Sequence, residues 1–196
     1  MKTILEHSFR IKSHDLNGLF RGIGNISSLV TRIEEQSMID PLRYDPQKYK
    51  GDAFEFFVEL FLMLNPNDKY IGVYEYSPVA SNDNGVDGTG KNVIGDKCVV
   101  QIKYKSNPME FLEGSKDHLA NMFSDGMLAH NVVADMRNKD NFRHFIFTTA
   151  EGLTTYTATE MFKSKVKCFV YNDFKKYVNG NTMFWNEVRT IVSNLQ

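Results

Sequence analysis

The chain has 196 residues, of which 42% are hydrophobic and 24% charged, and its 23 Lys and Arg residues almost balance its 24 Asp and Glu residues. This composition fits one globular domain that can bury a core, and it excludes collagen-like, disordered and coiled-coil classes. The net charge of −1 gives no overall electrostatic reason to expect nucleic-acid binding, so contact with a polyanion must come from local clusters of cations.

Signals for export or membrane insertion are not found in the sequence. No apolar run approaches the roughly 18 residues that a membrane helix needs, and residues 1–7 lack the apolar centre of a secretory signal. Cys98 and Cys168 each stand alone in an apolar run, which is typical of reduced core thiols and of neither a disulfide framework nor a zinc site. We therefore expect a cytoplasmic protein with no membrane partner.

The predicted elements begin with two helices. Apolar side chains recur at helical spacing over residues 25–36, which predicts an amphipathic helix. Residues 49–64 form a second predicted helix that is apolar almost all round, as is typical of a buried helix. The sequence is accordingly divided into an N-terminal helical extension, residues 1–43, and a main domain, residues 44–196.

Strands and further helices follow along the chain. Alternating side chains predict strands over 70–76 and 97–105, with a polar, turn-rich segment at 81–90 between them. The other predicted elements are a helical region after Pro108, strand 142–149, helix 154–163, strand 166–171, helix 173–178 and a last helix to Leu195. Strands separated by helices favour an α/β fold, in which a central mixed sheet is covered by helices.

Three carboxylates form one stripe on the apolar second helix. Asp52, Glu55 and Glu59 are three and four residues apart, so they share one face. A stripe of this kind is usually the solvated edge of a helix, and this is the interpretation we prefer for Asp52 and Glu59. Glu55 becomes a candidate site residue because of two features elsewhere in the chain.

The first feature is Asp87, which lies between Gly85 and Gly88 at the start of a strand. The second is the run from Gln101 to Lys105, in which an amide and two ammonium groups alternate with apolar side chains and so point to one face of a strand. A solvated sheet face would show the same pattern. Helices are predicted to cover this sheet, however, and a Lys buried beside a carboxylate is costly unless function requires it.

These motifs, in this order, resemble those of the PD-(D/E)xK nuclease superfamily, also called restriction-endonuclease-like. The motifs are Gly51-x-x-x-Glu55 on a helix, Gly85-Val86-Asp87 before a strand and Gln101-x-Lys103 on the next strand. The resemblance is greatest to the Mrr-type branch, which is similar to archaeal Holliday-junction resolvases, and it covers residues from about 50 to 178. It implies a three-layer fold with a central mixed sheet of about four to five strands flanked by helices, and a nuclease domain over residues 44–196.

The resemblance also implies a metal-dependent hydrolytic site. Asp87, Glu55 and the backbone carbonyl of Ile102 are the expected ligands of Mg²⁺ or Mn²⁺, because these hard cations prefer oxygen. Lys103 is expected to position or deprotonate the attacking water and to stabilise charge on the phosphate. Gln101 stands where the family more often has Glu; its amide oxygen can bind a metal but adds no charge, which favours one metal over two.

The implied substrate is DNA, and Lys91, Lys97 and Lys105 are the expected contacts with its phosphates. Restriction, phage-type DNA degradation and processing of branched DNA all fit such a site, in a bacterial, archaeal or virus-infected host cell. A homodimer is compatible with the sequence, and no organic cofactor is expected. Two alternatives stay open: a catalytically inactive nuclease-fold protein that binds DNA or serves in assembly, and an α/β interaction protein whose motif residues only cap turns.

Overall fold

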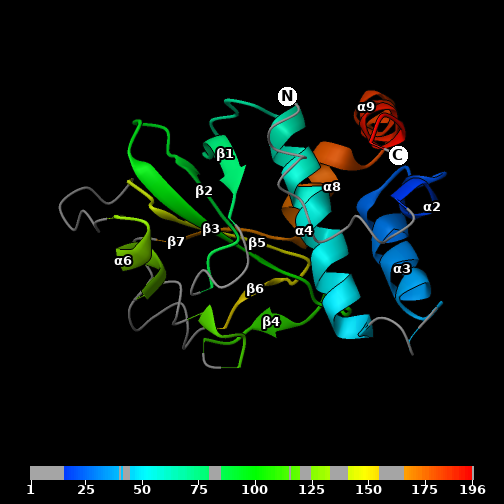
Figure 1. The fold of residues 1–196 in the computed structure, drawn as a ribbon, viewed down its shortest axis with the longest axis horizontal. Helices are drawn as coiled ribbons and strands as arrows, with labels where there is room; N and C mark the ends of the chain where they lie inside the picture. Colours follow the sequence, from blue (N-terminus) through cyan, green and yellow to red (C-terminus); the bar gives the residue numbers. More distant parts are fainter. Residues whose placement is uncertain are drawn as a thin grey trace.

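The computed structural model describes residues 16–39, 41, 45–79, 85–114, 116–119, 125–132, 141–154 and 166–195. A five-stranded sheet lies at the centre of the fold (Figure 1). Its strands are β1 (Tyr74–Pro78), β2 (Gly88–Lys91), β3 (Lys97–Lys103), β5 (His144–Thr148) and β7 (Val166–Phe169), in the order β1-β2-β3-β5-β7.

The sheet is mixed. The β1–β2 and β2–β3 pairs are antiparallel, whereas β3–β5 and β5–β7 are parallel. The antiparallel hairpins come first in the chain. The parallel pairs follow, and each of them needs a long connection that crosses a face of the sheet. The predicted α/β fold, with a central mixed sheet flanked by helices, is confirmed.

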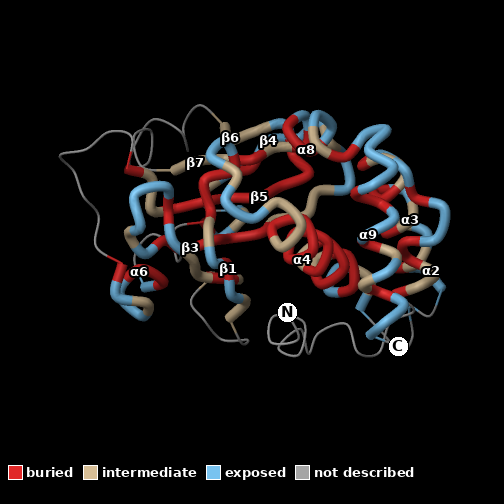
Figure 2. The backbone as a smooth tube through the Cα atoms, turned by 90° about the horizontal axis from the view of Figure 1, so that it is seen from above, coloured by how far each residue is buried: buried red, intermediate tan, exposed pale blue. Residues whose placement is uncertain are grey.

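Helix α4 (Pro46–Leu64) covers one face of this sheet. It begins where the side chain of Asp45 accepts a hydrogen bond from the backbone N–H of Gln47 at 2.8 Å, and Pro46 occupies a first-turn position where proline is tolerated. The helix therefore starts three residues before the predicted 49–64. Figure 2 shows why it is apolar almost all round: it lies between the sheet on one side and α2, α3 and α9 on the other.

The described part of residues 1–43 shares its core with the C-terminal helices. α2 (Leu16–Phe20), α3 (Ile26–Ser37), α8 (Tyr171–Val178) and α9 (Thr182–Ser193) belong to the same apolar cluster as α4. The backbone N–H of Ile26 donates to the Asn179 side chain at 3.1 Å, and Arg189 donates to the carbonyl of Ile23 at 2.9 Å. Residues 16–39 are thus packed against the rest of the fold through both apolar and polar contacts.

The opposite face of the sheet carries a smaller core around Val99 and Ile146. It is covered by β4 (Phe111–Leu112), which pairs with β6 (Gly152–Leu153), and by α6 (Met127–Ala129). The prediction of a helical region after Pro108 is therefore wrong at the start of that region, where β4 forms instead. The predicted helix over 154–163 lies outside the described residues except for Thr154.

Two other local predictions differ from the structure around β1 and β2. The strand predicted over 70–76 begins only at Tyr74, because the Asp68 carboxylate accepts the N–H groups of Tyr70 and Ile71 and turns the chain before it. Residues 88–90, which composition predicted as part of a loop, belong to β2, in agreement with the strand that the motif Gly85-Val86-Asp87 implied after Asp87. Its glycines are required by close packing, since a Cβ at Gly90 would lie 2.8 Å from the carbonyl oxygen of Tyr74.

In the described part of the chain, no helix combines the length and the apolar character that a membrane-spanning segment requires.

The buried carboxylate of Asp173, in the first turn of α8, gives the fold a pH-dependent contribution to stability. Burial alone would raise the pKa of Asp173, but hydrogen bonds from Lys176, the Val170 N–H and Tyr70 outweigh burial and hold its pKa below the usual value. A lowered folded-state pKa stabilises the fold above the unfolded-state pKa of about 3.9, and this contribution is lost as the pH falls through the folded-state pKa.

We therefore expect Asp173→Asn to lower the free energy of unfolding by about 1 kcal/mol at pH 7, with a smaller difference from the parent at pH 3. Urea unfolding at the two pH values measures this. Glu187→Gln, at an exposed position of α9, is the control and should change stability little at either pH. An Asp173→Asn effect of equal size at both pH values would contradict the assignment.

Candidate active site

Asp87 is attached to β3 through both its backbone and its side chain. Its backbone N–H donates to the carbonyl of Val100 at 2.9 Å, and its carboxylate Oδ2 accepts the N–H of Ile102 at 2.6 Å. The regular β2–β3 register ends at the pair Gly88 and Val100. The Asp87 carboxylate therefore takes the position that the next strand residue would occupy, directly beside the end of β3.

This arrangement leaves an open edge on β3 beyond Val100 in the described part of the chain. Gln101 and Lys103 pair with β5 on one side, while the peptide groups of Ile102 face the side of β2. Since the N–H and C=O of one strand residue point the same way, the Ile102 carbonyl lies on the side where Asp87 accepts the N–H. The Asp87 carboxylate and the Ile102 peptide oxygen, which are two of the expected metal ligands, thus share this edge.

The side chain of Gln101 is buried beside this edge. It is only 1% exposed, and neither its amide oxygen nor its amide nitrogen has a hydrogen-bond partner among the described residues. A buried amide left in this way costs on the order of 1–3 kcal/mol, so it needs an explanation. An oxygen ligand for a hard cation provides one, and the donor set of Asp87, Gln101 and Ile102 consists of the oxygen types that Mg²⁺ prefers.

Lys103 lies two residues further along β3 and is half-buried. Strand alternation puts its side chain on the same face as that of Gln101. Its ammonium has no ion-pair partner among the described residues, whereas Lys105 pairs with Asp117 at 2.7 Å. Lys103 is therefore a cation at this end of β3 that is available to a ligand.

Thr149 fixes the backbone that follows Lys103. Its hydroxyl accepts the N–H of Lys105 at 2.6 Å and donates to the Lys105 carbonyl at 2.7 Å, and its own N–H donates to the Lys103 carbonyl at 3.4 Å. The end of β3 is thus held rigidly. Thr149 is absent from the predicted site because no motif in the sequence points to it.

Glu55 is half-buried in the middle of α4. α4 packs against the face of β3 that carries Val100 and Ile102, and the ring of Phe54 lies 5.9 Å from that of Tyr104, just past the end of β3. The helix is thus beside the correct end of the strand, but on the face opposite Lys103. Among the described residues no three His, Cys, Asp or Glu side chains form a group that could hold a metal, so a Glu55 contact with Asp87 stays a prediction.

The two other carboxylates of the α4 stripe are not solvated, and the interpretation of Asp52 and Glu59 as a solvent-exposed edge is wrong. Both residues are 7% exposed. Asp52 forms an ion pair with Lys48, one helical turn earlier, in which Oδ2 lies 2.9 Å from Nζ. The pattern misleads because a helical repeat alone cannot show which segments of the chain cover its polar stripe.

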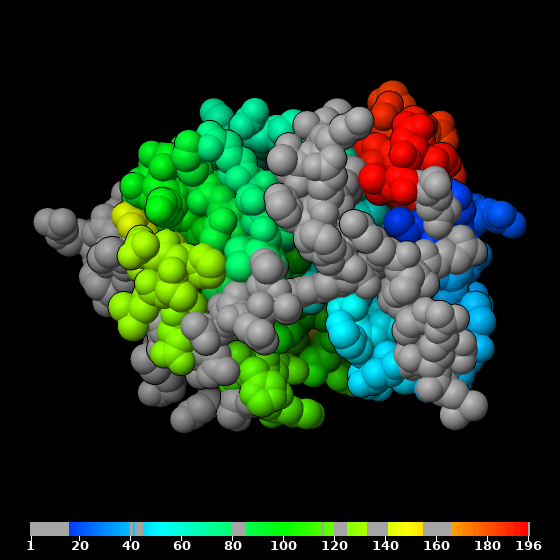
Figure 3. Space-filling model, in the orientation of Figure 1, coloured from blue at the N-terminus to red at the C-terminus, as the bar shows by residue number. Residues whose placement is uncertain are grey.

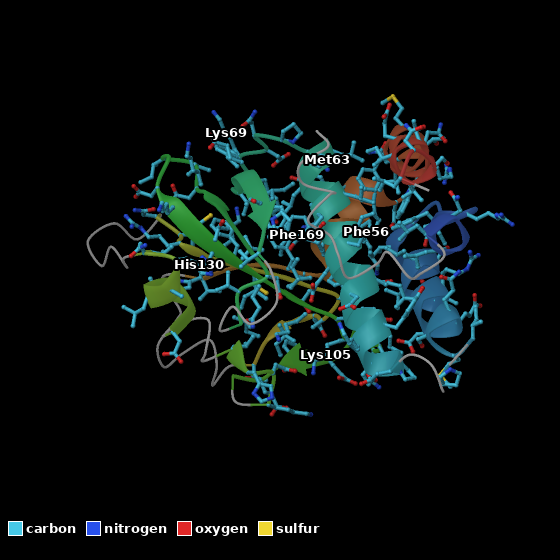
Figure 4. The ribbon with its side chains drawn as sticks, in the orientation of Figure 1. Phe56, Met63, Lys69, Lys105, His130 and Phe169 are labelled. Atoms are coloured by element: carbon cyan, nitrogen blue, oxygen red, sulfur yellow. The ribbon has the colours of Figure 1, made fainter. Side chains whose placement is uncertain are left out.

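The three lysines predicted to contact DNA occupy different surroundings. Lys105 is close to the site but is paired with Asp117, and both side chains are largely buried. Lys91 and Lys97 face each other at the other end of the β2–β3 pair. That end is four strand residues from Asp87, or roughly 13 Å, and Figure 4 shows Lys105 and His130 at opposite ends of β3.

Comparison of the chain with protein-family models, with curated proteins and with solved structures finds no match. The candidate site is therefore defined by the arrangement of Asp87, Gln101 and Lys103 around the open edge of β3.

Proposed function

We propose that this protein is a metal-dependent endonuclease that hydrolyses DNA phosphodiester bonds. The observation that carries the proposal is the cluster at the open edge of β3. It consists of a carboxylate, a peptide oxygen, a buried amide and a lysine, and neither the amide nor the lysine has a partner among the described residues. Hydrolysis of a phosphodiester needs oxygen ligands for a divalent cation and a positive charge near the phosphate, and this edge offers both kinds of group.

Each residue of the cluster has a role in the proposed mechanism. Asp87, the Ile102 carbonyl and the Gln101 amide oxygen would hold Mg²⁺ or Mn²⁺. When bound, the metal supplies charge neutralisation at the phosphate and lowers the pKa of a coordinated water. Lys103 orients or deprotonates the attacking water and donates a hydrogen bond to a phosphate oxygen. Thr149 keeps the backbone at Lys103 in place.

The charge of the cluster favours a single metal. Gln101 brings an oxygen but no charge, so Asp87 is the one carboxylate attached to this edge by the hydrogen bonds described above. Glu55, from α4, is the proposed second carboxylate, acting directly or through a water. One or two carboxylates suffice for Mg²⁺, which keeps several of its own water ligands.

A second candidate function is a nuclease-fold protein without catalysis, which binds DNA or takes part in an assembly. The observation that favours it is again Gln101, because an amide in place of a carboxylate weakens the hold on a divalent cation. The two candidates differ in whether phosphodiester bonds are cut, and both are proposed to act in the cytoplasm.

A titration with Mg²⁺ and with Mn²⁺ against supercoiled plasmid, single-stranded and branched DNA tests the proposal. We expect metal-dependent nicking or cleavage of at least one substrate, with no product in EDTA. Binding without cleavage under every condition would favour the inactive alternative. The absence of both binding and cleavage would contradict the nuclease and leave only a role in assembly for the second candidate.

A further inference from the structure

A pocket of about 260 Å³ opens at the far end of the β2–β3 pair from Asp87. Its polar lining includes Glu75, Lys91, Lys97 and His130. Strands β1, β2 and β3 form one side, and residues 125–132 form the other. Figure 3 shows this last segment lying against the β2–β3 region on the surface of the molecule.

The polar groups of the pocket are suited to an anion. Lys97 is exposed, and its ammonium has no ion-pair partner among the described residues. Lys91 pairs with Glu75 at 2.6 Å, so its charge is partly compensated. His130 contributes a ring nitrogen, Nε2, that is buried without a hydrogen-bond partner in the described part of the chain. Bound phosphate oxygens would provide this nitrogen with an acceptor and Lys97 with a counter-charge.

The backbone around the pocket holds these groups in place. Lys91 and Lys97 are directly opposite each other in the β2–β3 register. The turn between them is closed by the buried side chain of Asn92, whose Oδ1 accepts the N–H groups of Ile94 at 3.1 Å and Asp96 at 2.9 Å. Its amide also donates to the Phe142 carbonyl at 2.9 Å. A rigid turn reduces the entropy lost when the lysines bind a ligand.

Glu75 reaches the pocket through an irregularity in β1. Its φ of +50° lies in the left-handed region, which is strained for a residue with a side chain, and the β1–β2 register shifts between Tyr74 and Ser77. Such bulges redirect a side chain from its regular position. Here the result is a carboxylate that binds Lys91 and leaves Lys97 as the main free charge of the pocket.

We propose that this pocket binds a phosphate group of the DNA backbone, roughly 13 Å along β2 from the cleavage site at Asp87. The identification of DNA as the source of the phosphate rests on the proposed nuclease function, whereas the affinity for phosphate itself does not. The pocket fixes the register of the strand on the protein and reads no base.

Titration with inorganic phosphate at constant ionic strength, set with chloride, tests the pocket directly. The readout is the ring NMR signals of His130, assigned by comparison with His130→Gln. We expect Lys97→Met to weaken binding about fivefold, the effect of one contact charge near the surface. Glu75→Gln should strengthen binding by a similar factor, because it removes the repelling carboxylate. Lys69→Met, at an exposed position away from the pocket (Figure 4), should leave binding unchanged.

Opposite changes in Lys97→Met and Glu75→Gln cannot come from a general loss of folding, so this pair keeps the test decisive. Equal phosphate affinity in the parent and in Lys97→Met would overturn the proposal. So would phosphate that binds as an adventitious ion only, without any change in the ring signals of His130. This arm does not measure cleavage. A protein that binds phosphate here but cuts no DNA would support the pocket and contradict the nuclease.

Binding to single-stranded DNA in EDTA tests the source of the phosphate. Because each phosphate contact adds about 0.7 to the slope of log affinity against log salt concentration, Lys97→Met should reduce that slope by about 0.7. Lys69→Met should leave the slope unchanged. An unchanged slope in Lys97→Met, together with phosphate binding in the first arm, would overturn the DNA assignment and indicate a free phosphate or phosphomonoester instead.

Discussion

Replacement of Lys103 by methionine should lower the rate of Mg²⁺-dependent DNA cleavage by at least about 100-fold, the usual effect of removing one donor to a developing charge. Methionine retains most of the length of the side chain and removes only the ammonium. Because that ammonium has no ion-pair partner among the described residues, the midpoint of thermal unfolding should stay within about 2 °C of the parent. Lys103→Ala should be equally inactive, with a slightly larger loss of packing.

Asp87 needs a different substitution, since its carboxylate also accepts the N–H of Ile102 at 2.6 Å. Alanine would leave that N–H without its acceptor, at a cost of about 1–3 kcal/mol. Asn keeps an oxygen acceptor and removes the charge, so Asp87→Asn should abolish cleavage with a smaller effect on stability. Lys69→Met is the matched control and should cleave DNA at the parental rate. Full activity in Lys103→Met or in Asp87→Asn would defeat the site assignment.

Sequence patterns predicted the elements whose side chains alternate or recur strongly. The strand predicted over 97–105 is β3, and the helix predicted over 25–36 is α3, which Asn25 caps by accepting the N–H of Ser28 at 2.8 Å. In both segments the apolar period and the local start or stop signals agree. In these two segments the local preference for helix or strand agrees with the tertiary packing, so the sequence alone was sufficient to predict the element.

The prediction failed where tertiary packing decides the structure. β2 reads as a loop because its glycines lack the side chains that mark a strand, yet Gly88 lies under the ring of Tyr76 and has room for no Cβ. Asp52 and Glu59 were interpreted as solvated because a helical pattern cannot show which segments of the chain cover its polar stripe. Both errors concern contacts between segments far apart in the chain.

The same distinction applies to the candidate site. Asp87, Gln101 and Lys103 were grouped through the resemblance of their motifs to those of the nuclease superfamily, and the β2–β3 hairpin register accounts for the position of Asp87 beside β3. Thr149 and His130 could not be predicted in this way, since they reach β3 from the β5 end and from the segment around α6. Their positions depend on crossover connections, which no local pattern encodes.

Phe174→Ala should destabilise the protein by about 3–5 kcal/mol, the largest effect on stability expected from a single substitution outside the site. Phe174 is fully buried on α8, and its ring lies 4.8 Å from that of Phe169, 5.1 Å from Phe61 and 5.6 Å from Phe57. It therefore joins α4 to the sheet through β7. Removal leaves a cavity in the aromatic cluster and takes away its edge-to-face contacts, which are worth about 0.5–1.5 kcal/mol each.

Urea unfolding followed by the fluorescence of Trp185, the one tryptophan of the chain, measures this loss. Trp185 is a direct reporter because its ring stacks on Phe57 at 5.9 Å, next to the cavity. Phe174→Leu refills part of the space and should cost about 1.5 kcal/mol or less, and Met183→Ala, on the exposed side of α9, should change stability by no more than about 0.5 kcal/mol. A loss below about 1 kcal/mol for Phe174→Ala would contradict the packing described here.

Phe174→Ala also distinguishes a loss of stability from a loss of catalytic activity. The aromatic cluster lies on the α4 face of the sheet, whereas the Gln101 and Lys103 side chains leave β3 from the other face. At a temperature where Phe174→Ala is still folded, its cleavage rate per folded molecule should match that of the parent, while Lys103→Met is folded and inactive. If cleavage fell in proportion to stability in both variants, the activity would report only the folded fraction, and the assignment of Lys103 to the chemistry would fail.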